Sequence, residues 1–409
     1  LCDRRQRQMC IRDSSYPEEV HLRGYCSCPD GHKADVDKAV EALVEARRPV
    51  LLTGGGIVLS DMAEPLRAVV RQLQIPVVTT LMGKGSVPDD YEGNLGMVGM
   101  HGSYAANLAV TRCDLLLAVG VRFDDRVTGD VTQFAPLAKV VHFDIDKVEI
   151  NKIVHADISV HADLRWSLPL FCDGVKPYGD TLAKQYESWR KDVLNLKASH
   201  PFGTRDLDDA ISPQKLFEAV QRWTDDETIV VTDVGQHQMW TAQFFNLNEP
   251  RRFVTSGGLG TMGYGLPAAM GAKIGCPKAK VVLFTGDGSI MMNCQEFATL
   301  HKYGIDVKVI VLHNKVLGMV NQWQRMFYKG HCSQSIIADN PDLTAVAAAM
   351  GVPGEHVCLP NRLEKAVARL FETDGPALLD VSIPPDENVY PMVPGGKGLD
   401  QMVLGGEGQ

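Results

Sequence analysis

The sequence lacks the features of several protein classes. No apolar run approaches the roughly 20 residues that cross a bilayer, so we expect no membrane partner. There is no excess of basic residues, and the net charge of −9 argues against nucleic acid as the main partner. The ten cysteines are scattered, unlike those of a secreted disulfide scaffold, and the pair Cys26 and Cys28 beside His32 lacks the paired spacing of a zinc site. These absences favour a soluble intracellular protein with reduced thiols.

The organisation of the chain can be predicted from its patterns. Residues 1–33 show no apolar period and are interpreted as a leader of foreign origin followed by a linker. A first α/β unit covers 34–197, a polar connector covers 198–212, and a second α/β unit with a C-terminal tail covers 213–409. Strands alternate with helices in both units, which predicts two doubly wound parallel sheets.

The expected elements follow from apolar period and turn residues. In the first unit we expect strands at 50–52, 76–80, 115–119 and 140–143, helices at 34–46, 64–73 and 182–196, and a loop over 95–103. In the second unit we expect strands at 229–231, 253–255, 281–284, 307–312 and 378–381. A helix over 290–303 should be stopped by Gly304 as its C-terminal cap.

The strongest single pattern lies in KVVLFTGDGS and the LHNK that follows it. An apolar strand ends in Gly286, Asp287 and Gly288, where missing side chains let backbone amides approach an anion. A second apolar strand then delivers Asn314, and parallel neighbours would bring Asp287 and Asn314 to the same edge of the sheet. Carboxylate and amide oxygens suit a Mg²⁺ ion that also takes phosphate oxygens. The alternative is a structural βαβ unit whose Gly-Asp-Gly only makes a turn.

The first unit shows a related feature, because each of its strands ends in a glycine or a polar cluster. Those ends should lie on one edge of the sheet and form a nucleotide-sized crevice. The alternative is that these glycines only make turns.

Several motifs together resemble one enzyme family. In the second unit these are TDVGQHQMW, SGGLGTMGYGLPAAMGA, GDGS and LHNKVLGMVNQW, and they resemble the catalytic large subunit of acetohydroxyacid synthase (acetolactate synthase), a thiamine diphosphate (ThDP) enzyme. In the first unit IPVVTTLMGKG, LGMVGMHG, GVRFDDRVTG and HFDID resemble its FAD-binding middle domain. The resemblance runs from Tyr16 to NVYPMVPGG. It implies that the family's N-terminal domain, with the glutamate that activates the pyrimidine ring, would lie before Leu1.

The resemblance assigns ligands to the diphosphate end of ThDP. The side chains of Asp287 and Asn314 and the main-chain carbonyl of Val316 would hold Mg²⁺, with diphosphate oxygens and water completing an octahedron. The diphosphate itself would be contacted by Gly235, Gln236, His237, Gly288 and Ser289. His237 could instead be a buried, hydrogen-bonded histidine. His313 departs from the family pattern, which usually has asparagine there.

Other residues are implied near the reacting groups. Gly260 and Met262 would lie beside the pyrimidine, with Met262 as the wedge that keeps ThDP bent. Trp323 and Met319 would line the substrate channel, where one methylene is worth about 1 to 3 kcal/mol of acceptor preference. Arg126 would hold the acceptor carboxylate. The alternatives are a core methionine at 262, a core stripe containing Met319 and Trp323, and an ion pair of Arg126 with a neighbouring aspartate.

The resemblance also assigns FAD contacts to the first unit. They are Gly54, Gly55, Gly56, Thr80, Leu81, Met82, His101, Gly120, Arg122, Asp144 and Ile145. FAD has no redox role in the expected reaction, so the resemblance implies a structural part for it.

The resemblance implies acetolactate synthesis in branched-chain amino acid biosynthesis: decarboxylation of pyruvate on ThDP and carboligation to pyruvate or 2-oxobutyrate. It further implies a homodimer or tetramer, a regulatory small subunit, and a location in the cytoplasm of a bacterium or in a plastid or mitochondrion of a eukaryote. Alternatives are another ThDP and FAD enzyme, such as pyruvate oxidase or glyoxylate carboligase, and a non-catalytic cofactor-binding fragment.

Overall fold

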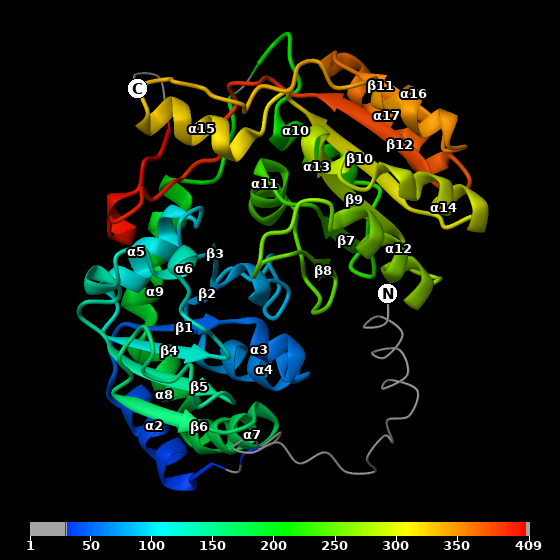
Figure 1. Cartoon of the computed structure of the whole chain (residues 1–409). Helices are drawn as coiled ribbons and strands as arrows, with labels where there is room; N and C mark the ends of the chain where they lie inside the picture. The colour runs from blue at the N-terminus through cyan, green and yellow to red at the C-terminus, as the bar shows by residue number, and fades with distance from the viewer. Residues whose placement is uncertain (1–28, 30, 206, 406–409) are drawn as a thin grey trace, which may run out of the picture.

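The computed structural model describes residues 29, 31–205 and 207–405, and it contains two six-stranded parallel sheets, one in each predicted unit (Figure 1). The predicted fold class is therefore confirmed. Most of the predicted leader and the Cys26 and Cys28 pair lie outside the described residues. Among the described helices, none has the length and apolar content needed to cross a membrane.

The first sheet has the strand order β3-β2-β1-β4-β5-β6. Its direction of winding reverses between β1 and β4, which are paired in parallel, and this switch point is where α/β sheets place ligands. Its strands are β1 (Pro49–Thr53), β2 (Val77–Thr79), β3 (Asn94–Met97), β4 (Leu115–Val119), β5 (Lys139–Asp144) and β6 (Ile158–His161). Its helices are α2 (Lys33–Glu45), α3 (Gly55–Leu59), α4 (Ala63–Leu73), α5 (Tyr104–Arg112), α6 (Asp125–Thr128), α7 (Leu164–Val175), α8 (Gly179–Gln185) and α9 (Glu187–Ser199).

The second sheet has a different order, β11-β12-β10-β9-β7-β8, and its winding reverses between β7 and β9. Its strands are β7 (Ile229–Thr232), β8 (Phe253–Val254), β9 (Val281–Gly286), β10 (Lys308–His313), β11 (Gly354–Val357) and β12 (Ala377–Ser382). Its helices are α10 (Pro213–Gln221), α11 (Gln236–Phe244), α12 (Gly265–Gly275), α13 (Asp287–Ile290), α14 (Phe297–Tyr303), α15 (Gly318–Phe327), α16 (Leu343–Ala349) and α17 (Pro360–Glu372).

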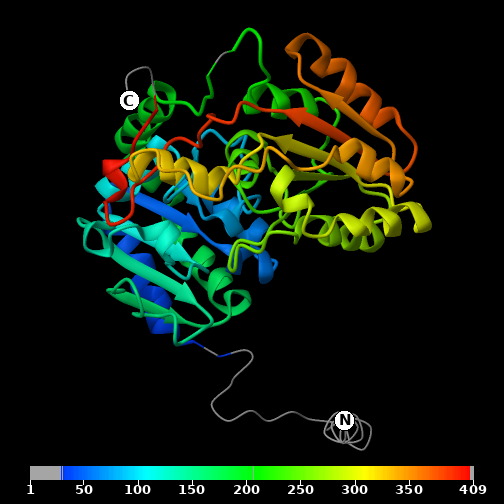
Figure 2. The ribbon, with the colours of Figure 1, turned by 45° about the horizontal axis from the view of Figure 1, so that its top comes forward.

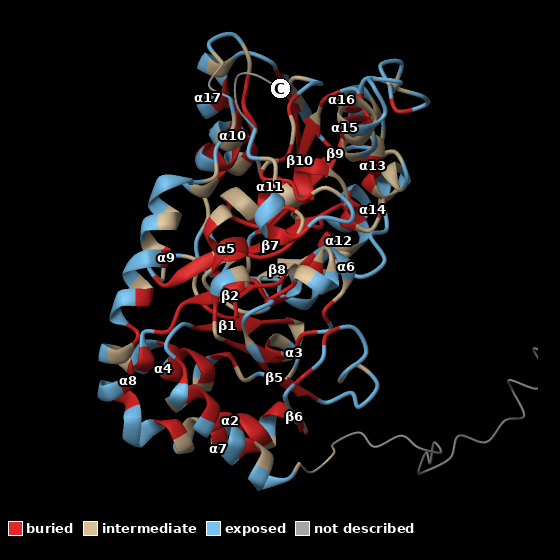
Figure 3. Ribbon diagram, turned by 90° about the vertical axis from the view of Figure 1, so that its left-hand side faces the viewer, coloured by how far each residue is buried: buried red, intermediate tan, exposed pale blue. Residues whose placement is uncertain are grey.

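Both sheets are buried on their two faces, as Figure 3 shows by the red strands between helices with exposed outer sides. Successive residues of β1 pack into different cores: Leu51 packs with α2, α4 and α7, and Leu52 packs with α5 and α9. In β9, Phe284 packs with α10, α11 and α17, and Leu283 packs with α12, α14 and α16. This alternation explains why the strands read as continuous apolar runs in the sequence.

Three of the expected elements were wrong. The loop expected over 95–103 contains β3, and β6 and β11 were not predicted. The helix expected over 182–196 is broken into α8 and α9 at Tyr186, which is buried and donates a hydrogen bond to the Leu43 carbonyl (2.6 Å). The helix expected over 290–303 is broken before α14, where Asn293 donates to the Gly263 carbonyl (2.6 Å). Gly304 does cap α14, with a φ of 60°.

The C-terminal tail returns from the second sheet to the first unit. Val393 donates a backbone hydrogen bond to Met100 (2.8 Å), and Asp130 donates one to Lys397 (3.0 Å). Val393 and Leu399 are buried in the core that also contains α5, and the red end of the ribbon lies beside that helix in Figures 1 and 2. The tail therefore ties loops of the first sheet to the edge of the second.

A buried arginine makes a second connection between the units. Arg67 of α4 is 4% exposed and donates to the carbonyls of Gly85 (2.8 Å), Ser86 (3.0 Å) and Asn248 (2.5 Å). Its guanidinium also pairs with Glu249 at 3.2 Å. Gly85 and Ser86 belong to the first unit, and Asn248 and Glu249 belong to the second. This one side chain therefore connects a loop of the first unit to a loop of the second.

Candidate functional site

The switch point of the second sheet brings two glycine turns together around a histidine. β7 is followed by Gly235, with a φ of 155°, and β9 ends at Gly286. The ring of His237 lies against both: a side chain at Gly286 would begin 3.0 Å from its Nδ1, and one at Gly235 would begin 2.7 Å from its Cε1. Its Nε2 is buried and has no hydrogen-bond partner in the described structure. This edge therefore holds an unused polar group beside two side-chain-free turns.

The loop after β10 is docked onto Asp287. Lys315, in the left-handed region with a φ of 62°, donates its backbone N–H to Asp287 Oδ2 (2.8 Å). Val316 donates its N–H to Asn314 Oδ1 (3.2 Å), and Asp287, Asn314 and Val316 are all buried. The structure thus brings the three predicted metal ligands into one loop contact at the edge shared by β9 and β10.

Burial dominates the electrostatics of Asp287. Desolvation raises the pKa of this carboxyl to about 6 from 3.8, and the nearby His313 opposes that rise. The pKa of His313 is raised, chiefly by its hydrogen bond with the Asp380 carboxylate. A buried carboxylate favours a cation that restores the interactions lost on desolvation.

The remaining predicted ThDP contacts surround this loop. Ser289 donates its hydroxyl to the Val234 carbonyl (2.9 Å). Gly288 is covered by Leu317, and the terminal carbon of Met262 lies 3.7 Å from where a side chain at Gly288 would begin. Gly260 is exposed, with a φ of 64°, and faces the Val234 side chain at 3.8 Å. Met262 is half-buried rather than a core residue, so its side chain reaches the Gly288 turn from outside.

Gln236 is more than a turn residue. Its Oε1 accepts from Asn314 Nδ2 (3.0 Å), and its Nε2 donates to Gln322 Oε1 (3.1 Å) and to the Glu387 carbonyl (2.9 Å). Gln322, fully buried on α15, also bonds both backbone groups of Val389 at 3.0 and 3.1 Å. The side chain thus joins the Asn314 loop to α15 and to the C-terminal tail.

Arg126 and Trp323 border the same segment of the tail. Arg126 is exposed, pairs with Asp125 at 3.4 Å, and lines a shallow hollow with Met100 and residues 393–396. Trp323 packs edge to face on Phe327 and lies 3.9 Å from the position of a side chain at Gly395. The ion pair of Arg126 with a neighbouring aspartate, one alternative from the sequence, is therefore present. Met319 and Trp323 are half-buried, and Met319 packs against the core beneath α15.

At the edge of the first sheet the glycines pack on one another. A side chain at Gly54 would collide with the Gly120 carbonyl oxygen, and one at Gly56 would begin 2.6 Å from Gly120 Cα. Gly120, with a φ of 64°, follows β4, so the turns at the switch point are in van der Waals contact. Packing of the turns is one reason for glycine at these three positions, and the contact of these residues with FAD stays a prediction.

The other predicted FAD contacts lie at the carboxyl ends of β2, β3, β4 and β5 or in the loops that follow them. Thr80 accepts from the Gly83 N–H (3.1 Å), and Leu81 and Met82 lie against Gly257 of the second unit. Arg122 and Ile145 are exposed on the rim of the edge.

Two further members of that set are buried. Asp144 accepts from the Asp146 N–H (2.8 Å). His101 is 5% exposed, has Nδ1 3.3 Å from the Pro391 carbonyl oxygen, and leaves Nε2 without a partner in the described structure.

The residues at the second edge fit a Mg²⁺ and diphosphate group. No other described residue donates a hydrogen bond to Asp287 Oδ1. The isolated antiparallel bridge between Val316 and Ile336 uses the Lys315 carbonyl and the Leu317 N–H, and it does not use the Val316 carbonyl. The carboxylate of Asp287, the amide oxygen of Asn314 and the main-chain carbonyl of Val316 are hard oxygen donors. The described residues contain no cluster of three His, Cys, Asp or Glu side chains that could hold a metal ion. His237 Nε2 has no partner among the described residues, and in the tautomer that carries the ring proton on Nε2 it can donate a hydrogen bond to an anion.

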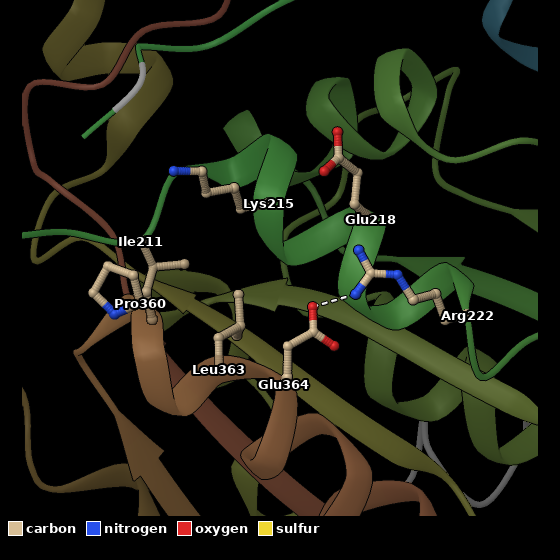
Figure 4. Close-up of a pocket in the computed structure, with 7 residues that line it drawn as sticks. All are labelled: Ile211, Lys215, Glu218, Arg222, Pro360, Leu363 and Glu364. Carbon is tan, nitrogen blue, oxygen red and sulfur yellow. Dashed lines mark hydrogen bonds and ion pairs between the residues drawn. The ribbon is translucent and has the colours of Figure 1, made fainter. Parts of the chain in front are cut away.

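A hollow between α10 and α17 is a separate feature (Figure 4). It contains the Arg222–Glu364 ion pair, and Glu218 accepts from Gln214 (2.9 Å). None of the predicted site residues lines it. We assign it no function.

Some polar residues at the second edge were not predicted. Asp233, fully buried after β7, accepts from the N–H groups of Val234 (3.0 Å) and Gly263 (2.8 Å). Its TDVG context after an apolar strand matches the TGDG pattern and could have been noticed. Gln322 and Asp380 have no comparable signal, because each acquires its role from residues far away in the chain.

Comparison with known proteins agrees with this geometry. Residues 233–381 match the family described as "Thiamine pyrophosphate enzyme, C-terminal TPP binding domain", and residues 36–170 match "Thiamine pyrophosphate enzyme, central domain".

Named relatives match over most of the chain. The sequence is 42% identical to "Probable acetolactate synthase large subunit" of Methanocaldococcus jannaschii, covering 95% of this chain and 66% of that protein. It is 40% identical to "Acetolactate synthase large subunit" of Haemophilus influenzae (95% and 68%), and 40% identical to "Acetolactate synthase, chloroplastic" of Arabidopsis thaliana (99% and 61%). The chain thus spans about two thirds of the length of these relatives.

Proposed function

The chain belongs to the acetolactate synthase large-subunit family, and we propose that it carries the Mg²⁺-ThDP and FAD sites of such an enzyme. The proposed reaction of the whole protein is decarboxylation of pyruvate followed by carboligation to pyruvate or 2-oxobutyrate, in branched-chain amino acid biosynthesis. A homodimer or tetramer, a regulatory small subunit and a cytoplasmic or organellar location belong to the same proposal.

One observation supports it most strongly, namely the docking of the Asn314–Val316 loop onto Asp287 through the Lys315 N–H bond of 2.8 Å. In the proposal Asp287, Asn314 and the Val316 carbonyl hold the ion, and His237 and the turns at Gly235 and Gly288 receive the diphosphate. ThDP, when bound, supplies the electron sink of the reaction.

The chain's own residues would position the cofactor and the acceptor. Met262, whose side chain lies beside the Gly288 turn, would support the cofactor with an apolar group. Arg126 would exchange its exposed contact with Asp125 for the carboxylate of the acceptor, which a guanidinium can bind through two parallel hydrogen bonds. Trp323, at the same tail segment, would exclude water and set the size of the acceptor pocket.

A proposed FAD occupies the edge of the first sheet. This placement is supported by the Nε2 of His101, which has no partner among the described residues, and by the exposed rim residues Arg122 and Ile145. FAD would act there as a structural group, because the proposed reaction transfers no electrons to it.

Calorimetry on the full chain tests the metal assignment. Asp287→Ala should abolish Mg²⁺-dependent binding of ThDP, because it removes the one carboxylate of the site. Asp192→Ala, which changes an exposed aspartate of α9, should bind ThDP like the unchanged protein. Equal affinity of the two variants would contradict the assignment.

An activity assay on the same preparation separates the two remaining candidates. Formation of acetolactate from pyruvate, lost on Trp323→Ala, supports the enzyme. Binding of FAD and Mg²⁺-ThDP without turnover would instead favour a cofactor-binding fragment.

A further inference from the structure

Four neighbouring strands of the second sheet carry a continuous row of polar side chains at their carboxyl ends. From β11 to β9 the row contains His356, Asp380, His313 and Asp287, one from each strand or from the residue that follows it. Asp380 and Asp287 are buried, with side-chain exposures of 4% and 2%. The proposed function gives no role to His313 or His356, and neither residue is needed to form the turns at this edge.

Asp380 anchors both histidines. Its Oδ1 lies 3.0 Å from His313 Nδ1, and its Oδ2 lies 2.9 Å from His356 Nδ1. With Nδ1 engaged in this way, the ring of His313 directs Nε2 toward Asp287, 3.6 Å from Oδ2. At that distance the contact is electrostatic rather than a hydrogen bond.

The contact falls on one particular oxygen of Asp287. Oδ2 already accepts the Lys315 N–H at 2.8 Å, so both protein groups approach the same side of the carboxylate. Oδ1 accepts no hydrogen bond from another described residue, so it is the oxygen left free to bind an ion. A carboxylate held at one oxygen by two groups cannot rotate freely about its last bond.

We propose that His313, buttressed by Asp380, is a positioning residue that fixes the Asp287 carboxylate so that Oδ1 faces the metal ion. This inference rests on the proposed metal site. Residues that hold a metal ligand in place typically contribute about 10- to 100-fold in metal affinity. The contact of His313 with Asp287 is longer than a hydrogen bond, so a loss at the lower end of that range, about tenfold, is expected when His313 no longer reaches Asp287.

The test measures Mn²⁺ affinity by electron paramagnetic resonance in the presence of saturating ThDP. His313→Asn keeps a donor in the Nδ1 position, toward Asp380, but does not reach Asp287. It should weaken Mn²⁺ binding about tenfold and broaden the spectrum of the bound ion. His313→Gln, whose amide can occupy the Nε2 position, should restore most of the affinity.

His356→Asn is the matched control, because His356 contacts Asp380 but not Asp287. It should bind Mn²⁺ like the unchanged protein. Asp380→Ala, which removes the hydrogen-bond acceptor of His313 Nδ1 and leaves His313 in place, should weaken binding as His313→Asn does. It also tests the inference if His313→Asn does not fold.

The outcomes are distinguishable. If the unchanged protein and Asp287→Ala bind Mn²⁺ and ThDP equally poorly, the proposed metal site fails. If Asp287→Ala abolishes binding but His313→Asn and Asp380→Ala bind as tightly as the unchanged protein, the site stands and the positioning role is overturned. Equal weakening by His356→Asn would likewise overturn it, since a general disturbance of the sheet edge would then explain the loss.

Discussion

Two buried histidines should make the ligand-free protein sensitive to acid. Burial lowers the pKa of His101 to about 4 and that of His237 to about 3, from 6.5. Each ring is only 5% exposed and leaves Nε2 without a partner in the described structure. Both histidines are therefore neutral in the folded protein across the pH range in which an unfolded histidine takes up a proton.

The sign and size of the effect follow from proton linkage. Above pH 6.5 neither state binds the proton, and the stabilising contribution of a neutral buried ring is fully present. As the pH falls from 6.5 toward 4, only the unfolded chain is protonated, so the free energy of unfolding decreases by about 1.4 kcal/mol per pH unit for each histidine. For His101 the loss sums to about 3 kcal/mol by pH 4, where its own folded-state pKa ends the decline.

Urea unfolding of the ligand-free protein at pH 7.5, 6, 5 and 4.5 measures this slope. His101→Asn keeps a donor for the Pro391 carbonyl and cannot be protonated, so its stability should fall less steeply, by about 1.4 kcal/mol per pH unit. His237→Asn should show the same reduction, and the double variant twice as much. His155→Asn, at an exposed position, should follow the unchanged protein. A His101→Asn slope equal to that of His155→Asn would refute the buried neutral ring.

Two further predictions concern stability at pH 7.5, measured by urea unfolding. Gly54→Ala should lower the free energy of unfolding by more than about 3 kcal/mol, because its new carbon would collide with the Gly120 backbone. Gly271→Ala in α12, where nothing lies within 4 Å of the new carbon, should raise the free energy of unfolding by about 0.5–1 kcal/mol. Equal effects of the two substitutions on the free energy of unfolding would contradict the close packing of the turns at Gly54 and Gly120. Arg67→Ala should cost about 3–5 kcal/mol, because it leaves buried carbonyls unpaired, while Arg251→Ala, which removes an exposed ion pair between the same units, should cost less than about 1 kcal/mol. A loss of less than about 1 kcal/mol for Arg67→Ala would mean that water replaces the hydrogen bonds of the guanidinium group.

The sequence was most informative about the central strands. The strand expected over 115–119 matches β4 residue for residue, because a strand buried on both faces is an uninterrupted apolar run. The strands that were missed lie at or near sheet edges, such as β3 (Asn94–Met97) and β11 (Gly354–Val357), whose residues are partly polar. Local pattern could not reveal them, because only pairing with a neighbouring strand defines them.

The broken helices have a similar origin. The period of 182–196 is helical throughout, but Tyr186 reaches across to the Leu43 carbonyl and the chain bends there. Asn293 likewise leaves the helical pattern to bond the Gly263 carbonyl. In both cases a side-chain contact with a distant residue determines the local backbone, and such a contact has no signature in the segment itself.

Within the candidate site, the predictable part is the part that is local in sequence. Asp287, Gly288 and Ser289 belong to one turn, and Asn314 and Val316 to another, so the order of strand and turn sufficed to place them at one edge. The bond of Gln236 to Gln322 joins residues 86 positions apart, and that of His313 to Asp380 joins residues 67 apart. These links depend on the strand order, which the sequence did not determine.

The glycines at the two sheet edges give different degrees of support for a bound ligand. At the first edge Gly54 and Gly120 exclude each other's side chains, so the packing of the turns is a sufficient reason for glycine. At the second edge the turns enclose His237, whose Nε2 has no partner among the described residues, and no other residue of that part of the chain donates to Oδ1 of the neighbouring Asp287. Unsatisfied buried polar groups cost free energy unless a partner arrives, and glycine turns that only pack do not create that demand. The physical argument for a bound diphosphate and cation is therefore stronger at the second edge, while that for FAD depends on the motifs of the first unit.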